Sequence, residues 1–231
     1  SFHPAIKRWV DGSRGDSLLG FYSDKITVVP VEEVILSWDI FMPTASIILN
    51  RSVVSRIASF FDLAKEAPVG DYYIRVLGAE NGGALYLNDI MSVYRYMIPG
   101  SFSERRRDSD SSGDDLWYRR CISAQAKLNT FIGNKYSELF DIRRKRYYSE
   151  VVRSLRLDVN TKKEIIGEDI DKIDIMDRIL WNAVFKHPSI ISIIKLPSVM
   201  KILRSSRQLV KQILSHSYRW YPGRQGSLEK I

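Results

Sequence analysis

The chain has 231 residues, of which 45% are hydrophobic, and it contains a single cysteine, Cys121. This hydrophobic content is enough for a buried core and excludes a wholly disordered protein. One cysteine excludes an intrachain disulfide and a thiolate metal cluster. No apolar run approaches the roughly eighteen residues that a membrane-spanning helix needs, so we expect no membrane span.

The formal net charge of +8 is unevenly distributed along the chain. Residues 1–100 carry a net charge of −2 and residues 101–178 carry +2, whereas residues 179–231 carry +8. Any polyanionic partner is therefore expected to bind the last quarter of the chain. The first residues, beginning with Ser1, are typical of a domain interior, so we expect the natural protein to start further upstream.

Hydrophobic periodicity predicts alternating strands and helices over the first hundred residues. Strands are expected at residues 2–6, 26–30, 45–49, 84–89 and 91–97, and the third of these is apolar enough to be buried on both faces. Helices are expected at residues 31–38, at 52–61, and from Asp71 to the closing sequence Asn81-Gly82-Gly83. This alternation predicts an α/β layer structure.

The composition turns abruptly polar at residues 101–115, which predicts a solvated loop and a domain boundary. Residues 1–105 are expected to form one domain, and residues 106–231 a basic, helical C-terminal extension. Helices of the extension are expected at residues 116–132, 135–155 and 161–185, and on both sides of Pro197.

Asp71 is the strongest chemical signal in the chain. It follows a glycine and precedes a helical run, so its carboxylate can accept hydrogen bonds from free backbone N–H groups at the positive end of a helix. Both effects keep the carboxylate ionised, as a general base must be. The alternative is an ordinary N-cap aspartate, which is the commoner role of such a residue.

Tyr94 and Arg95 follow a strand-like segment and precede the Pro99-Gly100 turn. A guanidinium at a strand end beside a loop suits phosphate binding, because its planar fork matches two oxygens. We expect this pair to point to the neighbourhood of Asp71. A structural arginine paired with Asp71 or Asp89 is an equally good interpretation.

The other candidate sites are weak. Asp108 and Asp110 resemble the start of a calcium loop, but the bidentate acid expected at the twelfth position of that loop is Arg119. We therefore expect a solvated acidic loop. The three histidines are scattered without ligand spacing, so we assign no metal site to His3, His187 or His216. Cys121 is expected to be a packing residue.

Residues 181–220 contain an amphipathic helical pattern with a basic polar face. A helical projection places Met200, Leu203 and Val210 on one half and Lys201 and Lys211 on the other. Such a helix, flanked by Trp and Tyr, is typical of a membrane-surface anchor that binds anionic lipid. Docking of the apolar face on the protein core is an equal alternative. No nucleic acid is expected, because interleaved aromatics and a helix-turn-helix signature are missing.

The order of several segments resembles the C-terminal half of bacterial family 2 glycosyltransferases. The segments are FHPA, VPVEEVIL, FMPTASIILNR, PVGDYYIRVLGAENG, YLNDIMSVYR and PGSFS, and they cover residues 1 to 105. The resemblance implies an inverting enzyme with a GT-A fold, here an incomplete mixed sheet with flanking helices. It also implies that a sugar passes from a nucleotide sugar to a saccharide or lipid-linked acceptor in cell-surface glycan synthesis.

The resemblance also implies the roles of particular residues. Asp71 would be the base that deprotonates the acceptor hydroxyl. Substrate-binding residues would be Pro43, Thr44, Ser46 and Gly70, together with Tyr94, Arg95 and Ser101 in the loop that closes over the donor.

Two departures from the family pattern are important. A histidine expected shortly after Arg95 is replaced by Tyr96, Met97 and Ile98. The nucleotide-binding half, with the ligands of the Mg²⁺ or Mn²⁺ ion that the complete enzyme would use, does not precede FHPA, so we expect this chain alone to be inactive. The resemblance places the enzyme in the cytoplasm, peripheral at the inner face of the plasma membrane. A non-catalytic membrane-surface module that retains the fold is the alternative, and a nucleic-acid binder is a weaker one.

Overall fold

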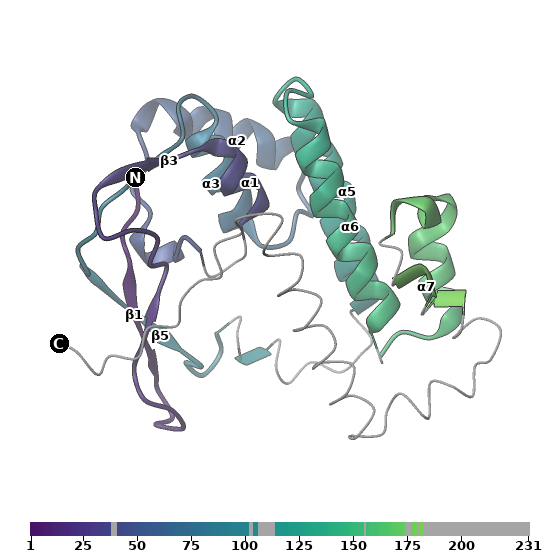
Figure 1. Cartoon of the computed structure of the whole chain (residues 1–231), viewed down its shortest axis with the longest axis horizontal. Helices are drawn as coiled ribbons and strands as arrows, with labels where there is room; N and C mark the ends of the chain where they lie inside the picture. Colours follow the sequence, from purple (N-terminus) through teal and green to yellow (C-terminus); the bar gives the residue numbers. More distant parts are fainter. Residues whose placement is uncertain are drawn as a thin grey trace. The chain divides into compact units, whose positions relative to one another are not determined.

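The computed structural model describes residues 1–37, 41–101, 104–105, 114–154, 156–173, 177–179 and 181–182 (Figure 1). The chain divides into two compact units. The first includes Ser1–Gly113 and Arg119–Arg144, and the second includes Asp114–Tyr118 and Lys145–Pro222. The domain boundary expected at residue 105 stays a prediction.

A three-stranded mixed sheet lies in the first unit. Its strands are β1 (Ala5–Trp9), β2 (Ser17–Leu19) and β5 (Ser92–Tyr96), in the order β2-β1-β5. The central strand β1 pairs antiparallel with β2 and parallel with β5. The sequence predicted β5 and the turn after β1, but it did not indicate β2, which contains only three residues.

A second, two-stranded sheet pairs β3 (Thr27–Val29) antiparallel with β4 (Ala84–Tyr86). The backbone of Phe2 forms two hydrogen bonds beside β4, donating to Leu85 O and accepting from Leu87 N, both at 2.9 Å. Together with the helices, these small sheets give a mixed α/β fold, which confirms the predicted class.

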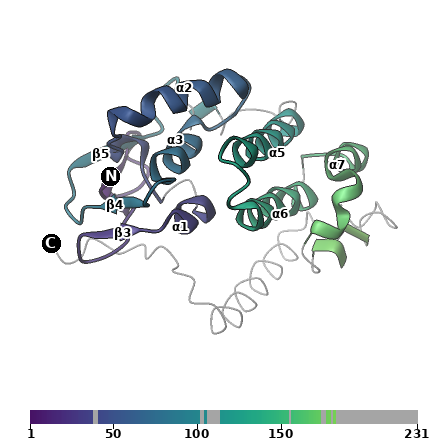
Figure 2. The ribbon, with the colours of Figure 1, turned by 90° about the horizontal axis from the view of Figure 1, so that it is seen from above.

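Three helices of the first unit lie side by side, with α3 (Gly70–Ala79) between α1 (Val31–Leu36) and α2 (Val54–Leu63) (Figure 2). Short 3-10 turns, η1 (Thr44–Ser46) and η2 (Arg51–Val53), come before α2. Since α1 lacks a basic residue in its last turn, its terminal carbonyls need donors from elsewhere.

These donors come from distant residues. Tyr72 of α3 donates its hydroxyl to Ile35 O at 3.2 Å, and the buried guanidinium of Arg143 donates to the carbonyls of Ile35 and Ser37. Arg143 also lies over the Tyr72 ring, with its Cζ 3.8 Å from the ring centroid. The end of α1 is thereby fixed against α3, the helix that carries Asp71.

The glycines after α3 behave as the sequence predicts. Gly82 and Gly83 have φ angles of +121° and +84°, and Gly83 N donates to Ala79 O at 2.8 Å. A Cβ at Gly83 would lie 2.3 Å from the carbonyl oxygen of Val29 in β3, so only glycine allows this approach.

The core of the first unit is aromatic at its centre. The ring of Phe60 lies 5.2 Å from that of Tyr73 and 5.6 Å from that of Phe131. Such tilted and edge-on ring pairs add to the free energy of apolar burial. Two long helices, α5 (Asp114–Phe131) and α6 (Ser137–Arg153), contribute further residues to this core, namely Ala124, Leu128 and Phe140.

The strand predicted at residues 45–49 is wrong. Its first residues belong to the η1 turn, and Ala45 and Ile48 are exposed. Ser46 closes the turn by donating both its backbone N–H and its hydroxyl to Pro43 O, each at 2.8 Å. Pro43 fixes its own φ angle, and Ser46 closes the turn by hydrogen bonding. These two local effects favour a turn more strongly than the apolar, β-type composition favours a strand.

In the second unit, the helix predicted at residues 161–185 does not continue. Helix α7 (Val159–Ile166) ends at Gly167, which has a φ angle of +52°, and a 3-10 segment, η4 (Gly167–Lys172), follows. The helices predicted around Pro197, and nearly all of the amphipathic segment 181–220, lie outside the described residues. Within the part of the chain that the structure describes, no helix has the length and apolarity to span a bilayer.

Candidate active site

Asp71 lies in the first turn of α3 and does not cap it. The capping position is Val69, and no side chain forms a capping hydrogen bond there. The N-cap role considered for Asp71 is therefore wrong. Its carboxylate is 21% exposed, so the side chain is neither sealed in the core nor fully solvated.

The backbone immediately before Asp71 is strained. Val69 has φ and ψ angles of 56° and 61°, in the left-handed region that a β-branched residue rarely adopts. Residues in this conformation cost roughly 1–3 kcal/mol and cluster at functional sites. This strained residue lies two positions before Asp71, where the chain enters α3.

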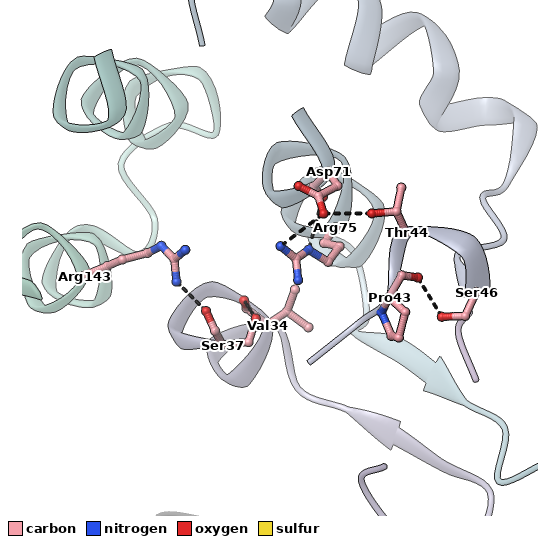
Figure 3. Close-up of polar contacts among 8 residues, drawn as sticks. All are labelled: Val34, Ser37, Pro43, Thr44, Ser46, Asp71, Arg75 and Arg143. Atoms are coloured by element: carbon pink, nitrogen blue, oxygen red, sulfur yellow. Dashed lines mark hydrogen bonds and ion pairs between the residues drawn. The ribbon is translucent and has the colours of Figure 1, made fainter. Parts of the chain in front are cut away.

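Thr44 is the principal partner of the Asp71 carboxylate. Its hydroxyl donates to Asp71 Oδ2 at 2.9 Å, across 27 positions of sequence (Figure 3). This bond joins two of the segments that the sequence analysis singled out, PTAS and VGDYY. No hydrogen bond from the described residues reaches the other carboxylate oxygen, Oδ1.

Arg75 supplies positive charge next to the carboxylate and was not among the residues predicted from the sequence. Its Nη2 lies 3.9 Å from Asp71 Oδ2, and its Nε donates to the Asp71 carbonyl at 3.2 Å (Figure 3). The arginine side chain is 1% exposed. The signal that was available is the four-residue spacing, which places both side chains on one face of a helix.

Tyr94 lies within electrostatic range of Asp71. Strand β5 lies against the η1 turn that carries Thr44. Burial raises the pKa of the Tyr94 phenol, and the negative charge of Asp71 raises it further. The phenol is therefore a neutral hydrogen-bonding group at neutral pH, beside a carboxylate.

Arg95 does not share this environment. Side chains alternate between the two faces of a strand, and in β5 Tyr94 is half-buried whereas Arg95 is exposed. The expectation that Tyr94 and Arg95 point to one place is therefore wrong for Arg95. Arg8, the neighbour of Arg95 in the β1–β5 register, is paired with Asp16 at 2.8 Å.

Pro43 and Ser46 shape the turn that holds Thr44. Ser46 is buried and donates to the Pro43 carbonyl, which makes it a structural residue (Figure 3). A Cβ at Gly20, just after β2, would lie 2.6 Å from Pro43 Cδ, and Gly20 has a φ angle of +75°. The end of β2 therefore contacts the turn that carries Thr44, and this contact is made through Pro43.

Gly70 and Ser101 have local roles in the structure. Gly70 is the first residue of α3, and a Cβ added there would meet the Phe61 ring at 3.4 Å. Ser101 accepts a hydrogen bond from Glu104 N at 3.3 Å in the turn after β5. Neither contact reaches the Asp71 carboxylate.

No group of three or more metal-ligating side chains occurs among the residues that the structure describes. The Asp108 and Asp110 pair lies outside them. Asp71 is thus a single carboxylate with a threonine hydroxyl, an arginine and a tyrosine nearby, a set suited to accepting a proton and unsuited to binding a divalent cation.

No family model, curated protein or solved structure matches this chain. The resemblance to family 2 glycosyltransferases therefore stays a prediction from the sequence motifs. What the geometry adds is the arrangement around Asp71, a partly exposed carboxylate with one oxygen, Oδ2, held by the Thr44 hydroxyl.

Proposed function

We propose that this chain is the acceptor-side portion of an inverting glycosyltransferase with a GT-A-like fold. In this proposal it transfers a sugar from a nucleotide sugar to a saccharide or lipid-linked acceptor. The observation that carries the proposal is the hydrogen bond between Thr44 and Asp71, which brings two family-like segments together around a partly exposed carboxylate.

In the proposed step, Asp71 Oδ1 accepts the proton of an acceptor hydroxyl as that oxygen attacks the anomeric carbon. The bond between the anomeric carbon and the nucleoside diphosphate breaks, and the diphosphate leaves. Thr44 holds the carboxylate in one orientation through Oδ2, and Arg75 places a positive charge 3.9 Å from the same oxygen.

A divalent cation would neutralise the leaving diphosphate in the complete enzyme. The described residues offer only Asp71 at this site, so they do not fit that cation. We expect its ligands in sequence outside this chain.

The test is Asp71→Asn in the full-length natural protein, assayed against a panel of nucleotide sugars. Asparagine keeps the acceptor oxygen for Thr44 but cannot take a proton. We expect kcat to fall by about 10² to 10⁴, equal to roughly 3 to 5 kcal/mol of barrier. Asp62→Asn is the matched control, because Asp62 is exposed on α2 and lies outside the site. An unchanged rate in Asp71→Asn would remove the catalytic role of Asp71, whereas no transfer by the wild-type protein would favour the non-catalytic module instead.

We also propose that the basic segment 181–220 holds the protein at the inner face of the cytoplasmic membrane. The net charge of +8 over residues 179–231 supports this proposal. Co-sedimentation with anionic vesicles, lost in neutral vesicles and at high salt, is the expected result. Equal sedimentation with both vesicle types would contradict it.

A further inference from the structure

A cluster of cations and aromatic rings occupies one face of the three-stranded sheet. Lys7 Nζ lies 3.7 Å from the centroid of the Tyr96 ring and 4.7 Å from that of Trp9. Arg14 Cζ lies 4.6 Å from the same Trp9 ring. Trp9 and Tyr96 are in edge contact at 4.6 Å and are neighbours in the β1–β5 register. We call these four residues the Lys7 cluster.

The positive charge of the Lys7 cluster is not neutralised by the described residues. The hairpin carries two carboxylates. Asp16 is bound by Arg8 through three hydrogen bonds of 2.8 to 3.2 Å, and Asp11 accepts a backbone hydrogen bond within its own turn at 3.0 Å. No carboxylate of the described residues lies in ion-pair range of Lys7 or Arg14. Burial lowers the pKa of the Lys7 ammonium, and the charge of Arg14 lowers it further. The cluster thus concentrates two like charges where water is partly excluded.

The attraction of the two cations to the aromatic rings offsets only part of the repulsion between Lys7 and Arg14. Each cation–π contact contributes about 0.5–1 kcal/mol at a partly exposed site. An anion carrying two charges would remove the repulsion and restore hydrogen-bond acceptors to both cations. A phosphate or diphosphate group has this charge and several acceptor oxygens.

The Lys7 cluster is continuous with the candidate active site. Lys7 is paired in register with Tyr94, the residue that senses the charge of Asp71. Paired strands lie about 4.8 Å apart, and residues two apart on a strand lie about 6.6 Å apart on the same face. The face therefore runs from the Asp71 neighbourhood through Tyr94 and Lys7 to Trp9 and Tyr96.

We propose that the Lys7 cluster binds a phosphate or diphosphate group of a substrate that reaches Asp71. This inference rests on the proposed glycosyl transfer for the identity of the substrate, although the anion site itself does not. Two sources fit the chemistry, a nucleoside diphosphate and the phosphate of a lipid-linked acceptor.

The experiment is calorimetric titration of the full chain with inorganic pyrophosphate. Arg14→Gln is the principal variant, because Arg14 is exposed in a turn and its loss does not disturb the core. Lys7→Gln is the second variant. Arg51→Gln and Lys65→Gln are matched controls, since both of these side chains are exposed outside the cluster.

We expect Arg14→Gln and Lys7→Gln each to raise the dissociation constant for pyrophosphate roughly tenfold, as the loss of one charged hydrogen bond does. Both controls should leave it unchanged. Absence of binding to the wild-type chain, or equal weakening by Arg14→Gln and Arg51→Gln, would overturn the proposal.

Further titrations identify the source of the phosphate. If UDP binds more tightly than pyrophosphate and depends on Arg14, the ligand is a nucleotide. If phosphatidylcholine vesicles that contain a polyprenyl phosphate bind in the same Arg14-dependent way, the ligand is the acceptor lipid. Either result supports the site.

The anion site and the catalytic role of Asp71 can be tested independently of each other. Asp71→Asn should leave pyrophosphate binding unchanged, because Asp71 is not part of the Lys7 cluster. If Arg14→Gln has no effect on binding while Asp71→Asn stops transfer, the anion site is wrong and the proposed function stands. The opposite pattern would retain the anion site and remove the catalytic role of Asp71.

Discussion

Each unit contains an arginine–aspartate pair, and the two pairs are built differently. In the second unit, Arg153 binds Asp177 through two hydrogen bonds of 2.6 and 2.7 Å, and the aspartate side chain is 3% exposed. In the first unit, Arg75 and Asp71 are 3.9 Å apart, and the aspartate is 21% exposed. The Arg153–Asp177 pair is in direct contact and its carboxylate is buried, so we call it the closed pair. The Arg75–Asp71 pair is longer and its carboxylate is partly exposed, so we call it the open pair. Two arginine–aspartate pairs thus differ in geometry and exposure, and we expect only the open one to be available to a ligand.

Breaking the closed pair should have the largest effect on stability. Arg153→Met keeps the apolar stem but leaves Asp177 buried without a counter-charge, so we expect a loss of about 3–5 kcal/mol in the free energy of unfolding. Urea denaturation measures it. The double variant Arg153→Met with Asp177→Leu should recover most of the loss, because it removes the buried charge. If the double variant is as unstable as the single one, the carboxylate is not the cause.

The buried Lys162 gives the second unit a pH-dependent stability. Its Nζ donates to Val152 O at 2.9 Å, and burial lowers its pKa from an ordinary value of 10.5 to about 8. Between these values the unfolded chain holds more protons than the folded chain, so stability rises with pH. Relative to Lys162→Met, the wild-type free energy of unfolding should rise by about 3 kcal/mol between pH 8 and 10.5.

The measurement is urea denaturation of both proteins across this pH range. Well below pH 8 the difference between them should be constant, since Lys162 is then protonated in both states. Parallel curves above pH 8 would contradict the shifted pKa.

Removing the Thr44 hydroxyl tests the open pair. Thr44→Val keeps the shape but loses the donor to Asp71 Oδ2, and hydrogen bonds to charged groups contribute about 1.5–3 kcal/mol. We expect kcat for glycosyl transfer to fall by roughly tenfold or more, with little change in KM for the donor. Thr44→Ser retains the hydroxyl and should restore most of the rate. If Thr44→Ser is as slow as Thr44→Val, Thr44 acts through packing and not through Asp71.

The sequence predicted those features that depend on local chemistry. The helix that carries Asp71 and its closing Gly82-Gly83 follow from composition and from backbone freedom. The strand expected at residues 45–49 failed because Pro43 and Ser46 form a turn that apolar periodicity does not detect. The opposite orientations of Tyr94 and Arg95 follow from strand alternation and were predictable once a strand was assigned there.

Other features depend on contacts between distant residues. The bond from Thr44 to Asp71 spans 27 positions, and the capping of α1 by Arg143 spans more than a hundred. No spacing rule within one helix or strand covers such distances. The role of Arg75 is intermediate, because its position four residues after Asp71 was visible but its burial was not.

The starts of two helices extend the comparison to the backbone. The N-cap residue of helix α7 is Asp158, which is extended and accepts hydrogen bonds from Asn160 N and Thr161 N at 2.8 and 3.0 Å. The N-cap residue of helix α3 is Val69, which is left-handed and forms no such bond through its side chain. The first arrangement is relaxed, whereas the second keeps strain next to Asp71.

This difference predicts an inverted order of two substitutions at Val69. In most positions glycine is less stable than alanine by about 0.5–1 kcal/mol, because it loses more backbone entropy on folding. In the left-handed region a Cβ costs roughly 1–2 kcal/mol, so Val69→Gly should be more stable than Val69→Ala by about 1 kcal/mol. Both variants lack the packing of the valine side chain, so this loss of stability largely cancels when they are compared. Urea denaturation of the pair measures the difference, and the usual order, with alanine more stable, would show that the turn before Asp71 carries no strain.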